Sequence, residues 1–169
     1  MPGKNVLMVI APSNFRDEEL FQTKSELEKA GATVTIASKG KGEKTGMLGG
    51  RANATVDITE ADVGNYDAVV FVGGTGSAAY FNDETAKSLA SKAYAEGKIV
   101  AAICIAPSIL ANADLLEGKK VTAFSSEAQN LQEKGATFTG KGVEVDGKII
   151  TADGPQSATE FGKTIAEAL

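Results

Sequence analysis

The chain has 169 residues, of which 43% are hydrophobic and 23% charged, a composition that suits one soluble globular domain spanning residues 1–169. Its formal net charge of -5 gives no overall basic field, so neither nucleic acid nor an anionic membrane is an expected partner. One cysteine and no histidine exclude an intrachain disulfide, a Ser-His-Asp triad, a Cys-His dyad and an imidazole metal site, and we expect neither metal nor cofactor.

The first part of the chain alternates between strand and helix patterns. Residues 4–12 form a continuous apolar run that ends at a proline, which is typical of a strand buried on both faces. This run is too short for a signal sequence or a membrane span, so we expect a cytoplasmic protein. Acidic residues open a helical pattern over 16–31, and 32–38 reads as a second strand. The glycine- and lysine-rich stretch 39–50 predicts a loop or small hairpin.

The alternation continues to the end of the chain. Buried strands are predicted at 66–74 and 97–104, with a fourth candidate of the same kind at 119–124. Asp146-Gly147, inside the alternating run 143–152, predicts an antiparallel hairpin with a type I′ turn. Helices are predicted at 83–96, 107–116, 127–134 and 155–169. The pattern predicts an α/β fold, a three-layer αβα sandwich with a mostly parallel central sheet plus a small antiparallel hairpin, with functional sites at the carboxyl ends of the strands.

Cys104, the only cysteine, lies where a predicted central strand meets a helix that starts at Pro107. Unpaired amides at a helix N-terminus stabilise an anion and can lower a thiol pKa below its free value of ~8.5. This placement predicts a thiolate at neutral pH. The alternative is a small buried hydrophobic residue, because free cysteine is among the most buried residue types.

A glycine-rich segment, residues 73–81, follows the neighbouring predicted strand. Backbone amides of Gly74 and Ile105 would then lie beside the sulfur, where they could hold an oxyanion formed when it adds to a carbonyl. Residues 74–79 also fit the dinucleotide pattern GxGxxA, but that fingerprint belongs after the first strand, with an acid ending the next one. A plain tight turn is the third interpretation.

Three acids, Asp17, Glu18 and Glu19, open the first predicted helix. Complementarity to the helix dipole is enough to explain Asp17 and Glu18. A carboxyl turned toward a thiolate would be pushed toward its protonated form by desolvation and like charge, and it could carry a proton without histidine. The residue pattern alone does not choose between Glu18 and Glu19 for this role.

These motifs together resemble the ThiJ/PfpI superfamily, also called the DJ-1/PfpI family, whose fold is flavodoxin-like and shared with class I glutamine amidotransferases. The resemblance rests on "DEEL", "VGG", "AAICIAP", "GKKVT", "VEVDGKIIT" and "DGP". It implies Cys104 as nucleophile or oxidation site, Glu19 as the protonated carboxyl beside it, and Gly74 and Ile105 as oxyanion donors. Arg51 falls where related proteins place an arginine near the substrate pocket, although a solvated loop charge is an equal alternative. The resemblance also implies a small carbonyl substrate and a homodimer or larger homo-oligomer.

The chain departs from the family pattern at three positions. The peptidase branch carries histidine directly after the nucleophile, whereas this chain has Ile105, so the resemblance is closer to the deglycase branch. Members of that branch often have a histidine near the pocket where this chain has Phe124, and a basic residue before the final Gly-Pro where it has Asp153. We therefore expect a different charge preference for the substrate.

The favoured hypothesis is a cysteine-dependent enzyme. The resemblance implies that it is of the glyoxalase or deglycase type and acts on α-oxoaldehydes such as methylglyoxal or on their adducts. The alternative is a non-enzymatic redox sensor or stress-response protein in which Cys104 is oxidised to a sulfinate held by protonated Glu19. A cysteine peptidase or amidase would need a proton carrier that the sequence does not offer. A scaffold subunit that kept the fold without activity is the fourth hypothesis.

Overall fold

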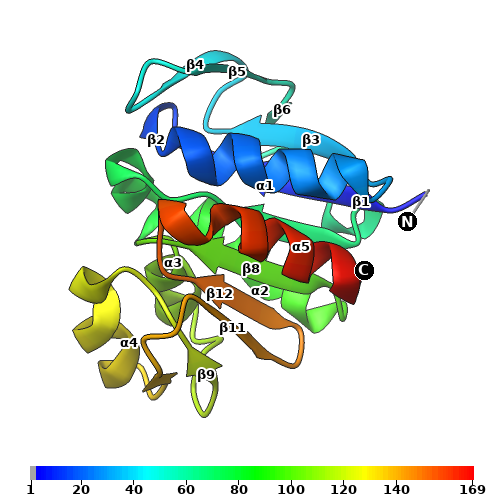
Figure 1. Ribbon diagram of the computed structural model, residues 1–169. Coiled ribbons are helices and arrows are strands. Elements are labelled where there is room, and N and C mark those ends of the chain that lie inside the picture. Colours follow the sequence, from blue (N-terminus) through cyan, green and yellow to red (C-terminus); the bar gives the residue numbers. More distant parts are fainter. Residues whose placement is uncertain (1–2) are drawn as a thin grey trace.

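A seven-stranded sheet forms the centre of the computed structural model, which describes residues 3–169 (Figure 1). Its strands are β1 (Asn5–Val9), β3 (Thr33–Ser38), β6 (Val56–Asp57), β7 (Ala68–Phe71), β8 (Ile99–Ile103), β11 (Val143–Asp146) and β12 (Ile149–Ala152). They lie in the order β11-β12-β8-β7-β1-β3-β6, and every neighbouring pair is parallel except β11 and β12. The predicted mostly parallel sheet with an antiparallel hairpin at its edge is therefore confirmed.

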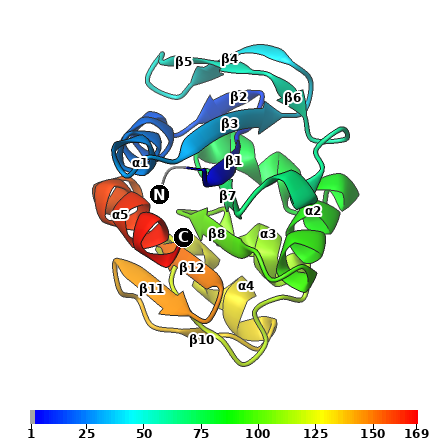
Figure 2. The ribbon, with the colours of Figure 1, turned by 90° about the vertical axis from the view of Figure 1, so that its right-hand side faces the viewer.

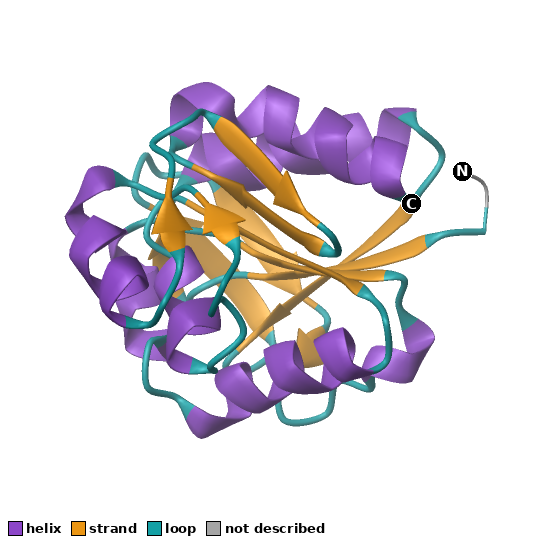
Figure 3. Cartoon of the chain, turned by 90° about the horizontal axis from the view of Figure 1, so that it is seen from below, coloured by secondary structure: helices purple, strands orange, loops and turns teal. Residues whose placement is uncertain are grey.

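Helices cover both faces of this sheet, which confirms the predicted three-layer αβα sandwich. Helices α1 (Asp17–Lys29) and α5 (Ala158–Ala168) lie on one face, and α2 (Glu84–Ala95) and α3 (Pro107–Asn112) lie on the other (Figures 2 and 3). The short helix α4 (Ala128–Glu133) packs against α3.

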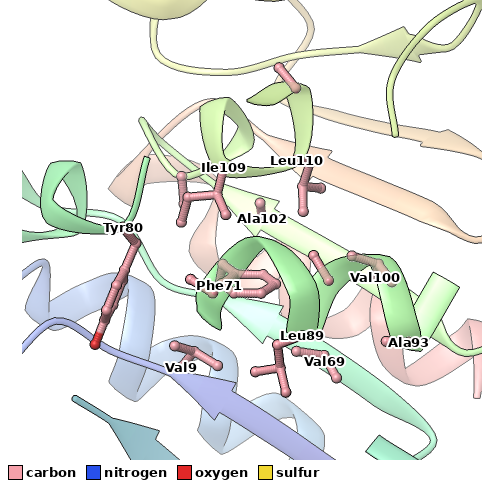
Figure 4. Close-up of a cluster of buried hydrophobic side chains, with 14 of the residues drawn as sticks. Val9, Val69, Phe71, Tyr80, Leu89, Ala93, Val100, Ala102, Ile109 and Leu110 are labelled. Atoms are coloured by element: carbon pink, nitrogen blue, oxygen red, sulfur yellow. The ribbon is translucent and has the colours of Figure 1, made fainter. Parts of the chain in front are cut away.

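The sheet is buried from both sides, which explains why its central strands are continuous apolar runs. Every residue of β7 and β8 is buried. Side chains pointing to one face pack against α2 and α3, where Phe71, Leu89 and Ile109 meet (Figure 4). Those pointing to the other face pack against Leu20 of α1 and Phe161 of α5.

The prediction of a fourth central strand at residues 119–124 is wrong. Only Lys120–Val121 forms a strand, β9, and it pairs with β10 (Thr137–Phe138) in a separate two-stranded sheet. The place beside β8 is taken by β12, and the backbone N–H of Thr122 donates to the side-chain oxygen of Thr151 at 3.0 Å instead of to a strand carbonyl.

The hairpin turn also differs in type from the prediction. Asp146 pairs with Ile149, so the two loop residues are Gly147 and Lys148, and of these only Gly147 has a positive φ, of 61°. A type I′ turn needs positive φ at both positions. The prediction of a type I′ turn is therefore wrong, and glycine at the first loop position supplies the left-handed conformation alone.

A second, three-stranded sheet lies beside the first helix. It joins β2 (Ser13–Phe15), which the sequence did not reveal, to the hairpin β4 (Gly42–Gly46) and β5 (Arg51–Ala54). Of the loop or small hairpin predicted for 39–50, the structure has the hairpin, although its second strand lies just beyond that range. The Asp17 carboxylate fixes it to α1 by accepting the amides of Leu48 at 2.8 Å and Gly50 at 2.7 Å.

Two predicted helices are shorter than expected. The helix predicted to reach residue 116 ends at Asn112, and two residues later Asp114 has a φ of 62°. At the C-terminus, the 3-10 turn Pro155–Ser157 precedes α5. None of the helices within residues 3–169 combines the length and apolar character that crossing a bilayer requires. That residues 1–169 form a single domain stays a prediction.

The close crossing of α1 and α5 depends on Gly162, and we expect Gly162→Ala to destabilise the fold. A Cβ at this position would lie 2.9 Å from both the Thr23 backbone oxygen and the Glu26 Cβ. Although alanine is the better helix former, the overpacking should lower the free energy of unfolding by about 1–3 kcal/mol. Urea denaturation measures this change, with exposed Lys163→Ala in the same helix as the control. A Gly162→Ala protein as stable as wild type would contradict the packing described.

Candidate functional site

Cys104 occupies a strained bend directly after β8. Its φ of 65° lies in the left-handed region, which residues other than glycine rarely adopt. Its N–H donates to the Ala152 carbonyl at 2.9 Å, and its carbonyl accepts the Phe124 N–H at 2.7 Å. These two bonds hold the thiol, which is half-buried, at the carboxyl edge of the sheet.

Glu19 approaches the same point from the first turn of α1. Its side chain is fully buried, and its Oε1 accepts the Gly73 N–H at 3.0 Å. Its other oxygen, Oε2, has no hydrogen-bond partner within residues 3–169. Glu18 instead points toward Arg16, to which it is joined by two hydrogen bonds of 2.8 and 3.0 Å. The structure thus selects Glu19 as the acid beside the cysteine.

Gly73 is the residue that lets the acid and the thiol meet. A Cβ on Gly73 would lie 2.5 Å from Glu19 Oε1 and 2.6 Å from the Cys104 Cβ. No larger residue fits there without displacing one of the two. The first glycine of the "VGG" motif after β7 is therefore required because no side chain fits at that position.

Burial makes both groups harder to ionise. It raises the pKa of Glu19 from 4.5 to about 7, against the lowering effect of the nearby Cys104 thiol, of the Gly73 N–H and of the Arg16 charge. Burial also raises the pKa of Cys104 from 9.0 to about 12, and the negative charge of Glu19 adds to this rise. Near neutral pH the pair therefore holds at most one negative charge.

The backbone amides of Gly74 and Ile105 lie where the sequence predicted them. Both donate hydrogen bonds that lower the pKa of Cys104. They do not outweigh burial, so the expectation that the free protein holds a thiolate at neutral pH is not supported. The helix that follows, α3, has only six residues and a correspondingly small dipole effect.

Arg16 is a site residue that the sequence analysis missed. The charges of Glu19 and Cys104 both raise its pKa, after the larger effect of its hydrogen bond with Glu18. Its N–H also donates to the Gly73 carbonyl at 3.0 Å. The only available signal was its position directly before the acidic turn. Arg51, by contrast, is exposed on β5 and pairs with Glu43 at 3.8 Å, so a substrate-binding role for it stays a prediction.

A cavity of about 270 Å³ opens next to the cysteine backbone; we call it the Phe124 cavity. Phe124, which donates to the Cys104 carbonyl, and Asp153, which follows Ala152, are both part of its wall. The full lining is Ala123, Phe124, Ser125, Phe138, Gly140, Asp153 and Gln156. A larger cavity of about 830 Å³ lies elsewhere, between α2 and the loop around Asp62.

The dinucleotide interpretation of residues 74–79 finds no support in their packing. They form a 3-10 helix, Thr75–Tyr80, after β7 and not after the first strand. Gly76 leaves no space for a side chain against the backbone of Ser13, so its role is close contact between chain segments. Within residues 3–169, no cluster of three or more His, Cys, Asp or Glu side chains could hold a metal ion.

The raised pKa of Glu19 predicts a pH-dependent stability. As pH rises from 4.5, the unfolded chain ionises at Glu19 before the folded protein does, so the folded state loses stability until about pH 7. Relative to Glu19→Gln, the wild-type free energy of unfolding should fall by about 3 kcal/mol across this window. Urea denaturation at several pH values measures the difference, and a difference independent of pH would contradict it.

Comparisons with known proteins agree with this architecture. The model of the DJ-1/PfpI family matches residues 4–168. An uncharacterized protein of Methanocaldococcus jannaschii is 41% identical over 172 residues, covering 100% of this chain and 84% of that protein. The deglycase PfpI of Pyrococcus furiosus is 31% identical over 149 residues, which cover 88% of this chain and 90% of that protein.

Comparison with solved structures supports the same fold. The crystal structure of a ThiJ/PfpI domain protein from Brachyspira murdochii has a TM-score of 0.95 and 36% identity, and the match covers 98% of this chain and 96% of that one. Because the family model spans nearly all residues and relatives exceed 30% identity over most of their length, the chain belongs to the DJ-1/PfpI family.

Proposed function

We propose that this chain is a cysteine-dependent enzyme of the glyoxalase or deglycase type, acting on α-oxoaldehydes such as methylglyoxal or on their adducts. The observation that carries the proposal is the convergence of one thiol, one buried carboxyl with a raised pKa and two backbone amides at the bend after β8. Relatives named as deglycases, at about 30% identity, support the same type of activity.

The first step is addition of the Cys104 sulfur to the aldehyde carbon of the substrate. The thiol proton passes to the Glu19 carboxylate, and the new carbon–sulfur bond turns the aldehyde oxygen into an oxyanion. The amides of Gly74 and Ile105, which lower the pKa of the thiol, would stabilise that oxyanion. Return of the proton from Glu19 to the oxyanion completes a hemithioacetal and leaves Glu19 ionised.

The second step moves hydrogen between adjacent carbons. Glu19 removes the proton from the former aldehyde carbon to give an enediolate and returns it to the neighbouring ketone carbon, while the hydroxyl proton on the first carbon's oxygen passes to the oxygen of the second carbon. The first carbon is thereby oxidised to a thioester and the second reduced to an alcohol. Water cleaves the thioester, which releases the 2-hydroxy acid and restores the thiol. A carboxyl whose pKa is about 7 suits both directions of this proton transfer at neutral pH.

The proposal includes a homodimer or larger homo-oligomer and a cytoplasmic location. Cys104 is only half-buried, so the site is open from at least one side. No role for Arg51 is needed in either chemical step. Its exposed position leaves it available to a substrate or to a partner subunit.

Substitution of the two central residues tests the proposed chemistry. Cys104→Ala should abolish methylglyoxal consumption, and Glu19→Gln should lower kcat by about 10²–10⁴-fold because the proton carrier is lost. Loss of methylglyoxal and formation of lactate are the measurements. The matched control is Glu28→Gln, the same change on the exposed face of α1. Wild-type rates in Cys104→Ala would disprove the mechanism.

The unpartnered oxygen of Glu19 favours the redox sensor as the second candidate. Two molecules of peroxide convert a thiol to a sulfinic acid and release two waters, and the resulting sulfinate oxygens need hydrogen-bond donors. Protonated Oε2 could supply one donor, and the Gly74 and Ile105 amides could supply others.

The sensor function predicts selective oxidation of Cys104 at low peroxide. Intact mass should rise by two oxygens in wild type. Glu19→Leu has no donor for the sulfinate oxygens, so its products should differ in mass from that of the sulfinic acid. A sensor should show this behaviour with negligible methylglyoxal turnover. Equal peroxide sensitivity and equal product masses in wild type and Glu19→Leu would count against it.

A further inference from the structure

We propose that the Phe124 cavity is a subsite for a positively charged group, so that the cysteine acts preferentially on carbonyl compounds that carry an ammonium or guanidinium. This inference rests on the proposed function. It names a property that the catalytic groups themselves do not fix: the charge of the substrate.

The segments that line the cavity are bonded to the backbone of Cys104, and we infer that a substituent of whatever reacts with the thiol can reach it. Two backbone hydrogen bonds connect its walls to that residue: the Phe124 N–H donates to the Cys104 carbonyl at 2.7 Å, and the Cys104 N–H donates to Ala152, the residue before Asp153, at 2.9 Å. The volume of about 270 Å³ has room for several non-hydrogen atoms but not for a drug-sized ligand. It therefore suits one end of a small substrate.

Asp153 is the only charged residue among those that line the cavity. One carboxylate oxygen, Oδ1, accepts the Ser157 hydroxyl at 2.6 Å, which fixes the direction of the side chain. Within residues 3–169, Oδ2 accepts no hydrogen bond, and no lysine or arginine forms an ion pair with this carboxylate. A fixed carboxylate with a free oxygen in a cavity wall attracts a cation and repels an anion.

The rest of the lining suits a cation that is weakly hydrated. Phe124, whose side chain is 48% exposed, and Phe138 bring two aromatic rings to the cavity. Aromatic faces attract ammonium and guanidinium groups, and guanidinium is the more readily desolvated of the two. The amide side chain of Gln156 adds a hydrogen-bond acceptor. For an anionic substrate such as a free oxoacid, the lining offers only the neutral donors of Ser125 and Gln156 and no lysine or arginine.

Charged thiol reagents test the subsite without requiring turnover. Cys104 is the only cysteine, so intact mass reports its reaction alone. The probes are methanethiosulfonates bearing a trimethylammonium, a sulfonate or an uncharged methyl group, each of which forms a disulfide with the thiol and releases methanesulfinate. The measured quantity is the ratio of the cationic to the anionic rate constant, divided by the same ratio for N-acetylcysteine.

We expect this ratio to be about tenfold lower in Asp153→Asn than in wild type, because the field of one nearby carboxylate acts on the two charged probes with opposite sign. The difference between wild type and Asp153→Asn should become smaller at high salt, which screens that field. Asparagine can still accept the Ser157 hydroxyl, so the fold should be retained. Phe124→Leu should slow the cationic probe while leaving the uncharged probe unchanged. The matched control is Glu167→Gln, which removes one charge from the exposed C-terminal end of α5, opposite the end of the sheet where β8 stops (Figure 1).

A second assay compares turnover of phenylglyoxals that carry a trimethylammonium or a carboxylate on the ring. The ratio of their kcat/KM values should fall in Asp153→Asn in parallel with the reagent ratio. A fall of less than about threefold in the reagent ratio, or an equal fall in Glu167→Gln, would overturn the proposed subsite. If neither phenylglyoxal is turned over by any protein, the proposed enzymatic function fails, and the reagent ratio still decides on the cation preference.

Discussion

The peptide group of Gly73 is the contact on which the geometry of the site depends. Its N–H donates to Glu19 and its carbonyl accepts the Arg16 N–H, so one residue at the end of β7 holds the start of α1 by both of its polar groups. The absence of a side chain lets the Glu19 oxygen and the Cys104 Cβ approach from opposite sides. A buried carboxyl thus has a fixed position, although the helix that carries it belongs to a different layer from the strand that carries the thiol.

This arrangement replaces histidine by sharing a proton between two acids. Both the Glu19 carboxyl and the Cys104 thiol lose hydration on burial, which raises both pKa values, and the negative charge of Glu19 raises the pKa of Cys104 further. The free protein therefore keeps its sulfur protonated near neutrality, and in the proposed mechanism the thiolate arises when the thiol proton moves to Glu19. The backbone amides of Gly74 and Ile105, which lower the pKa of Cys104, would stabilise that state. The Cys104 thiol, the Gly73 N–H and, to a smaller extent, the Arg16 charge limit the rise in the Glu19 pKa to about 7, so that the carboxyl can still ionise at physiological pH.

The sequence predicted the layers, the parallel strands and the bend at Cys104, because continuous apolar runs and a proline directly after the bend are local signals. The sequence did not predict which strands pair with each other. Residues 119–124 have the pattern of a central strand, but β12 occupies the position beside β8, and β9 pairs with β10 in a separate sheet. The site was predictable where backbone groups define it, as at Gly74 and Ile105. The choice of Glu19 over Glu18 and the involvement of Arg16 depend on side-chain direction, which requires the contact between α1 and Gly73. Burial, which raises the thiol pKa, is likewise a property of the assembled layers.

Phe124 and Asp153, two of the three positions at which the sequence departs from the expected family pattern, are connected to Cys104 through its own backbone. The left-handed turn at Cys104 directs its N–H to β12 and its carbonyl to Phe124, so the segments that carry both residues are anchored to the strained residue itself. Side chains at these positions can change without altering the bonds that hold the thiol, because both anchors are main-chain groups. The charge and shape of the adjacent cavity can therefore change while the main-chain groups that hold the sulfur keep their positions. In this chain the cavity lining combines one carboxylate, Asp153, with two phenylalanines, Phe124 and Phe138, and both Phe124 and the residue before Asp153 are hydrogen-bonded to Cys104.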